Sequence, residues 1–136
     1  MGTRAMYTFL EKGARFNVYK HHDGYPEGAA EAIRNALSKA WELPRFEADE
    51  FAAAFVAANK TSSGGVRLMS SGTPKTAAPS DIEFRYVIQQ DPQVNRLLRI
   101  TVFSTDYGDP RTEKKLFAGS LSEFENWAAA VEQLSA

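Results

Sequence analysis

Residues 81–89 read DIEFRYVIQ, and the character of the side chains alternates along this stretch. Successive residues of a β-strand point to opposite faces of a sheet. One face would carry Ile82, Phe84, Tyr86 and Ile88, and the other Glu83, Arg85, Val87 and Gln89. The stretch therefore predicts a strand with one side in the core, in a sheet whose two faces differ in character.

The next strand repeats the alternation. Residues 95–104 (NRLLRITVFS) place Leu98, Ile100 and Val102 on one side. The reverse sides of the two strands combine arginine with apolar groups, which is the composition of a protein interface. We predict an interface face made of Arg85, Val87, Leu97, Arg99 and Phe103. A homodimer contact, a phosphate site built on the guanidinium groups and an ordinary solvent-facing surface are the alternatives.

The remaining segments supply four more strands and three helices. Residues 6–10 and 15–21 predict a hairpin around Lys12-Gly13, and residues 66–69 and 112–118 predict two further strands. From Gly28, apolar residues recur at spacings of three and four as far as Trp41, so we expect a helix that Pro44 ends.

A second helix is expected to begin between Phe46 and Asp49, where carboxylates suit the positive end of the helix dipole. Ser120 and Ser122 are both candidate N-caps of a last helix, because a glutamate follows each by three residues.

These elements define an α+β fold. Their order is β-β-α-α-β-β-β-β-α, which predicts a mostly antiparallel sheet with the helices packed on one sheet face. The 136 residues suit a single domain, 1–136, and we expect a mobile loop at 70–80 (SSGTPKTAAPS).

The composition excludes several functions. Sixteen basic and 17 acidic residues give a net charge of −1, which argues against direct nucleic-acid binding. The absence of cysteine excludes disulfides, thiol nucleophiles and cysteine-bound zinc. No apolar run approaches the length of a membrane span, so we expect no membrane insertion.

Residues 19–28 (YKHHDGYPEG) hold both histidines of the chain. A metal or catalytic site would need His21 or His22 with Asp23 and a remote carboxylate such as Asp106 or Asp109. If the strand continued through them, however, the two histidines would point to opposite faces. The simpler interpretation is an Asp-Gly turn before a helix. A third is a ligand or partner loop formed by Tyr19, His21, His22, Asp23 and Tyr25. We predict no catalytic residue, metal ligand or cofactor.

The first 30 residues or so resemble a group of small phage and prophage proteins. These proteins open Met-Gly-Thr-Arg, as residues 1–4 do, and carry a Tyr-x-His-x-Asp-Gly-Tyr motif after the first hairpin. Tyr19, His21, Asp23, Gly24 and Tyr25 stand at the motif positions. The resemblance implies a mobile-element origin but no reaction.

These observations favour a non-enzymatic phage or prophage accessory protein that binds a host protein in the bacterial cytoplasm. By analogy it could be a counter-defence inhibitor of the anti-CRISPR kind. The alternative is a small-molecule or nucleotide-binding protein that uses the loop from His21 to Tyr25, where tyrosine could stack on a base.

Overall fold

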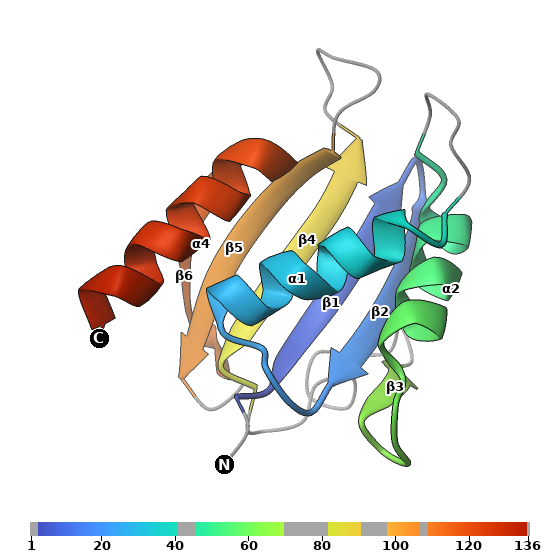
Figure 1. Ribbon diagram of the computed structural model, residues 1–136, viewed down its shortest axis with the longest axis horizontal. Coiled ribbons are helices and arrows are strands. Elements are labelled where there is room, and N and C mark those ends of the chain that lie inside the picture. The colour runs from blue at the N-terminus through green and yellow to red at the C-terminus, as the bar shows by residue number, and fades with distance from the viewer. Residues whose placement is uncertain (1–2, 41–45, 70–81, 91–97, 107–108, 136) are drawn as a thin grey trace.

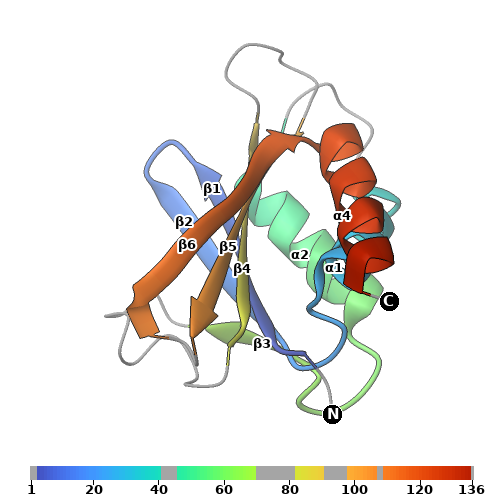
Figure 2. The same cartoon turned by 90° about the vertical axis from the view of Figure 1, so that its left-hand side faces the viewer.

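In the part of the chain that the computed structural model describes, three helices lie on one face of a six-stranded sheet (Figures 1 and 2). The structure describes residues 3–40, 46–69, 82–90, 98–106 and 109–135. The strands are β1 (Ala5–Glu11), β2 (Ala14–Lys20), β3 (Val66–Met69), β4 (Phe84–Gln90), β5 (Leu98–Asp106) and β6 (Asp109–Ser120). The helices are α1 (Pro26–Leu37), α2 (Ala48–Asn59) and α4 (Leu121–Ser135). The predicted α+β class and the predicted order of elements are confirmed.

The sheet is mixed. Its strand order is β3-β2-β1-β4-β5-β6, and every neighbouring pair is antiparallel except β1 and β4, which are parallel. The hairpin puts β2 on one side of β1, so β4 takes the other side when the chain returns after two helices and β3. Strands linked by short turns must be antiparallel, whereas this long connection permits a parallel neighbour.

The alternation predicted for β4 and β5 is confirmed. In β4, Tyr86 and Ile88 are fully buried on the helix side. They lie beside Tyr7 and Phe9 of β1 and beside Val102 and Ile100 of β5, which are also fully buried. From α2, Phe55 packs on this layer, with its ring centroid 4.5 Å from that of Tyr7. The core therefore lies between the sheet and the helices.

Helix α1 ends earlier than its apolar pattern predicts. It stops at Leu37 instead of running to Trp41, because Ser38 caps it: the Ser38 N–H donates to Asn35 O and its Oγ donates to the same carbonyl. Ala40 still packs against the core beyond the helix end. A periodic apolar pattern reports which residues are buried, and a turn can continue that burial after helical geometry has ended.

Of the two predicted caps of the last helix, the chain uses Ser120. The Ser120 N–H donates to Glu123 Oε1 over 2.9 Å, and the Glu123 N–H donates to Ser120 Oγ over 3.2 Å. This reciprocal pair is a capping box. The mobile loop expected at 70–80 lies wholly outside the described residues.

Two tyrosine hydroxyls lie in the core in different surroundings. The rings of Tyr7 and Tyr86 stack with centroids 5.1 Å apart. The Tyr86 hydroxyl donates to Gly24 O over 2.6 Å, whereas the Tyr7 hydroxyl is buried with no hydrogen-bond partner among the described residues. Burial raises the pKa of both hydroxyls, and the Asp23 carboxylate raises that of Tyr7 further. Both groups are therefore neutral, and only one is satisfied.

This difference predicts opposite effects of the same substitution. Tyr86→Phe should lower the free energy of unfolding by about 1–2 kcal/mol, because it removes a buried hydrogen bond. Tyr7→Phe should leave it unchanged or raise it by up to about 1 kcal/mol, because it removes an unpaired buried hydroxyl. Urea denaturation of the two variants measures both values. Equal losses would contradict the assigned hydrogen bonding.

Candidate functional site

The sheet face that no described helix covers, here called the helix-free face, is built of cross-strand rows. Side chains of directly paired residues point to the same face, so the strand register defines each row. The first row is Arg67, Tyr19, Met6, Arg85, Phe103 and Lys115. The second is Met69, Asn17, Thr8, Val87, Thr101 and Ala118. The third consists of two paired segments, Arg15 with Leu10 and Gln89 with Arg99 and Ser120. An uncharged row thus lies between two rows that carry basic residues.

The central residues of the middle row, Asn17, Thr8 and Val87, are buried, and we therefore call this row closed. Thr8 is 2% exposed, and its hydroxyl donates to Asn17 Oδ1 over 2.8 Å, which satisfies both groups. Val87 is only 7% exposed. The apolar side chain that we predicted on the interface face at Val87 is therefore buried, and contact with a partner would have to come from the rows on either side.

Arg85 is engaged within the protein. Its Nε and Nη2 donate to the two carboxylate oxygens of Glu113 over 2.8 and 2.7 Å, and its guanidinium stacks over the Phe103 ring at 4.6 Å from the centroid. Both partners of this bidentate pair are about three-quarters buried. Arg85 and Phe103 therefore join β4, β5 and β6. Arg99 lies half-exposed in the third row, and Leu97 lies outside the described residues.

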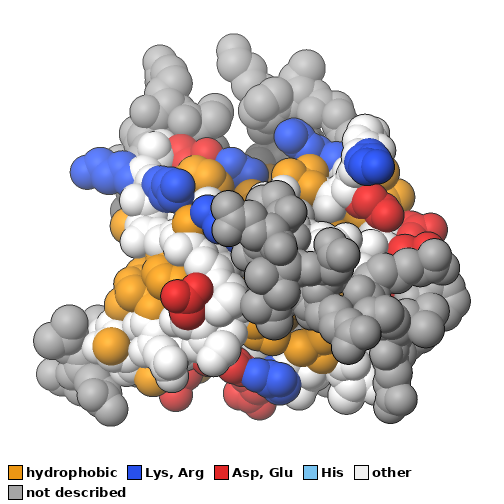
Figure 3. Space-filling view, turned by 90° about the horizontal axis from the view of Figure 1, so that it is seen from above, with side chains coloured by type: hydrophobic (Ala, Val, Ile, Leu, Met, Phe, Trp, Pro, Cys, Tyr) orange, Lys and Arg blue, Asp and Glu red, His pale blue; other side chains and the backbone are white. Residues whose placement is uncertain are grey.

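Charge is segregated between the two layers. Among the described residues, the helix-free face carries six basic side chains and two acidic ones. They are Arg4, Arg15, Arg67, Arg85, Arg99 and Lys115, against Glu83 and Glu113. The helices carry the reverse excess: Glu27, Glu31, Asp49, Glu50, Glu123 and Glu125, against Arg34. Figure 3 looks down on the molecule and shows most of the Lys and Arg side chains visible there in the half away from the viewer of Figure 1, with some Asp and Glu side chains among them. A chain of net charge −1 thus has a basic sheet face and helices with an excess of acidic residues, although Lys39 and Lys60 follow two of these helices.

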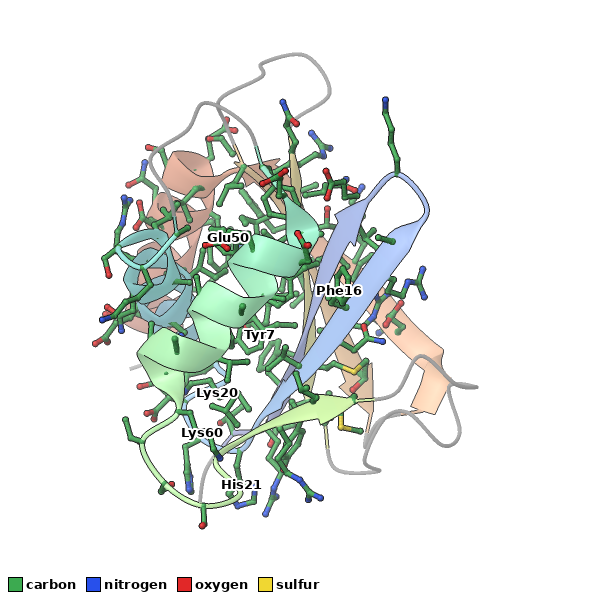
Figure 4. All side chains as sticks on the ribbon, turned by 90° about the vertical axis from the view of Figure 1, so that its right-hand side faces the viewer. Tyr7, Phe16, Lys20, His21, Glu50 and Lys60 are labelled. Carbon is green, nitrogen blue, oxygen red and sulfur yellow. The ribbon has the colours of Figure 1, made fainter. Side chains whose placement is uncertain are left out.

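At one end of this face, the two stretches that carry the phage-protein resemblance meet. Arg4 Nε donates to His21 Nδ1 over 3.2 Å, and Tyr19 Oη lies 2.7 Å from the same atom. The Gly24 N–H donates to Thr3 O over 2.8 Å. The residues after Met1-Gly2 therefore lie against the loop that follows β2, although the first hairpin separates them in sequence. Figure 4 shows His21 at this end of the sheet.

An arginine N–H can only donate, so the Arg4 contact makes Nδ1 of His21 an acceptor, which corresponds to a neutral ring with its proton on Nε2. The Tyr19 hydroxyl lies within hydrogen-bonding distance of the same nitrogen. Among the described residues, no three His, Asp or Glu side chains gather to hold a metal ion. Asp106 and Asp109 lie in described strands, but the positions of their side chains are not described.

The two histidines do not straddle the sheet. Strand β2 ends at Lys20, and the ring of exposed His22 lies edge-on to that of His21, with centroids 4.6 Å apart. Lys20 Nζ donates to His22 O over 2.6 Å. Burial lowers the pKa of the Lys20 amino group, while the carboxylates of Asp23 and Glu31 act in the opposite direction.

The Asp-Gly-Tyr-Pro-x-Gly segment has a conformational explanation at four positions. Asp23 has a φ of 58°, a left-handed conformation that Asp tolerates better than most residues. A Cβ on Gly24 would lie 2.7 Å from Ala5 Cβ, and one on Gly28 would lie 2.3 Å from Asp23 O. Pro26 occupies the first turn of α1, where its missing N–H costs nothing. Tyr25 is 37% exposed and Asp23 is exposed. The loop is therefore primarily a tight turn from strand to helix.

No sequence pattern indicated Arg15, Arg67 or Glu113 as site residues, and Arg4 was noted only as part of the opening Met-Gly-Thr-Arg. These four residues lie in or next to four different strands, and only the strand register brings them onto one face. The alternation of β2 could have placed Arg15 with Tyr19, because both have odd numbers in one strand. The pairing of Arg85 with Glu113 crosses β5 and depends on bulges between β5 and β6.

No family model, curated protein or solved structure matches the chain. Among the described residues, no helix is both long and apolar enough to cross a membrane.

Gly28→Ala tests the importance of the turn. In an unobstructed helix this substitution would stabilise the protein by about 0.5–1 kcal/mol. The 2.3 Å approach to Asp23 O should reverse the sign and cost more than about 2 kcal/mol, because backbone must shift to admit the methyl group. Chemical denaturation measures the difference, with Asn35→Ala on the exposed side of the same helix as the control. A stabilised Gly28→Ala variant would refute the close approach.

Proposed function

We propose that the chain is a non-enzymatic phage or prophage accessory protein that binds an acidic surface of a host protein through its helix-free face. The observation that carries the proposal is the placement of basic side chains in the two rows that flank the closed middle row. The resemblance of the first 30 residues to phage and prophage proteins supports the origin, and inhibition of a host defence complex is the role that this origin favours.

The geometry supports binding rather than chemistry. Arg15, Arg67 and Lys115 are exposed and Arg99 is half-exposed, whereas Arg85 and Phe103 brace the strands from within. Fixed positive charge on a rigid sheet attracts an acidic partner and orients it, since complementary potentials raise association rates and specificity. A β-sheet also holds these side chains at defined spacings. The partner of this proposal is therefore a folded protein with an acidic patch.

Reversing charge in the third row should strongly reduce capture of this partner. In Arg15→Glu combined with Arg99→Glu, two cations become anions on the proposed contact surface, and the amount of host protein captured from a bacterial lysate should fall at least about tenfold. Quantitative mass spectrometry of the captured proteins measures it. Lys39→Glu changes an exposed lysine that follows α1 on the helix side and should leave capture intact.

Two results would overturn this proposal. One is equal capture by the double variant and the parent protein when both have the same thermal stability. The other is loss of capture after the lysate is treated with nuclease, which would make the partner a nucleic acid instead of a protein.

The cluster of Arg4, Tyr19 and His21 favours a second candidate, binding of a nucleotide or another small anionic molecule. Arg4 and His21 are partly buried and Tyr19 is buried, and together they bring a guanidinium, a phenol and an imidazole within hydrogen-bonding distance. Such groups suit a phosphate and a base.

A bound nucleotide should raise the melting temperature of the protein by a few degrees at millimolar concentration, because a ligand that binds only the folded state stabilises it. Arg4→Ala should remove the shift and Arg15→Ala should retain it. A panel of nucleoside triphosphates and cyclic nucleotides that leaves the melting temperature unchanged would exclude this candidate.

A further inference from the structure

Helix α2 is apolar on both its inner and outer sides. Residues 52–58 read AAAFVAA and contain no polar side chain over almost two turns. Phe51 and Phe55 bury the inner side against β1, whereas Ala53 and Ala57 are exposed on the outer side. A helix at a protein surface normally has a polar outer face, and one that is apolar all round is typical of a helix covered on both sides.

Charged residues bound this outer face at its two ends. Glu50 lies in the first turn of α2, and Lys60 follows its last residue. The positions 50, 53, 57 and 60 are spaced by three, four and three residues, so they form one stripe along the helix. Figure 4 looks onto this side of the molecule and shows Glu50 and Lys60 at opposite ends of α2. The stripe is acidic at one end, basic at the other and made of alanine between them.

Such a stripe is complementary to itself when two copies run antiparallel. A two-fold axis midway between Ala53 and Ala57 places each of these alanines opposite the other in the second copy. The same axis places Glu50 opposite Lys60 of the second copy, about 15 Å from its symmetry-related pair along the helix. The Lys60 amino group contacts the carbonyls of Ser62 and Val66 over 3.3 Å each. An ammonium has three donors, so one remains to meet a carboxylate.

Exposed apolar side chains extend this surface beyond the helix. Leu68 of β3 is 77% exposed and Phe16 of β2 is 39% exposed. Their pairing with Val18 and Phe9 puts both on the sheet face that carries α2. Two alanines alone would bury far less than the roughly 1,200 Å² of a stable interface. Leu68 and Phe16 supply large apolar groups that α2 leaves at the edge of the sheet.

From these observations we propose that the chain forms a two-fold symmetric dimer in which α2 packs antiparallel against α2 of a second copy. Alanine side chains permit close helix approach, the Glu50–Lys60 pairs set the antiparallel direction, and Leu68 and Phe16 pack at the periphery. This interface is distinct from the helix-free face and does not depend on the function proposed for that face.

Analytical ultracentrifugation of the full chain and its variants tests the dimer. The parent protein should sediment as a dimer at about 100 μM, and Ala57→Glu should weaken the dimer at least about 100-fold, because it buries an unpaired charge at the contact. Ala130→Glu makes the same change at an exposed position of α4, on the far side of α1 from α2, and should remain dimeric. A monomeric parent protein, or a dimer that Ala57→Glu leaves intact, would overturn the proposal.

Exchanging the charges of Glu50 and Lys60 provides a second test, which leaves the alanines of the stripe unchanged. Glu50→Lys and Lys60→Glu should each weaken the dimer, since each places like charges opposite one another. The double variant restores opposite charges and should recover at least about tenfold of the lost affinity. If the double variant folds but does not recover dimer affinity, the antiparallel arrangement is ruled out.

Discussion

The fold depends on the close approach between the turn at 23–28 and the start of β1. Strand β2 ends at Lys20 and α1 begins at Pro26, so the chain must reverse its direction within five residues to place α1 across the sheet. It does so because Gly24 has no side chain to collide with Ala5, and because Gly28 lets α1 begin against the Asp23 carbonyl. The Tyr86 hydroxyl then ties the Gly24 carbonyl to the central strand β4. This turn positions α1, and both α2 and α4 pack beside α1.

Much of this architecture could be predicted from local pattern. Alternation in residues 82–89 and 98–103 assigned the buried and solvent-side faces of β4 and β5, because the pleat of a strand leaves no choice once one side is apolar. The period of three and four predicted the first helix, and first-turn carboxylates and capping residues predicted where the other two begin. The end of α1 was wrong by about one turn because burial at Ala40 extends the apolar period after Ser38 has ended the helix. The parallel pairing of β1 and β4 has no local signal, since it depends on where a distant strand docks.

The candidate site also combines residues that a local sequence pattern indicates with residues that only distant contacts bring together. Tyr19, His21 and Asp23 drew attention because two histidines and an Asp-Gly turn are unusual together, and the structure brings Tyr19 and His21 into contact. Their partner Arg4 comes from the other side of the hairpin, where no spacing in the sequence indicated it. Net charge was equally uninformative. A value of −1 conceals a basic sheet face, because the acidic residues that balance it lie on the helices. The net charge of a chain does not indicate on which face of the molecule the charged side chains lie.

The two proposed surfaces are compatible because they lie on different sides of the molecule. The α2 stripe faces away from the sheet, whereas the basic rows project from the opposite face of the same sheet. Pairing through α2 would leave the exposed basic side chains of both helix-free faces accessible and would join the two faces through two helical layers. Two basic faces in one particle can engage two acidic sites on a multisubunit host complex, and the second contact then forms at a high effective concentration. A small domain with modest charge on each face would gain affinity in this way without a larger interface. The proposed interface on the helix side would therefore strengthen the binding function proposed for the sheet side, even though each surface is defined by its own residues.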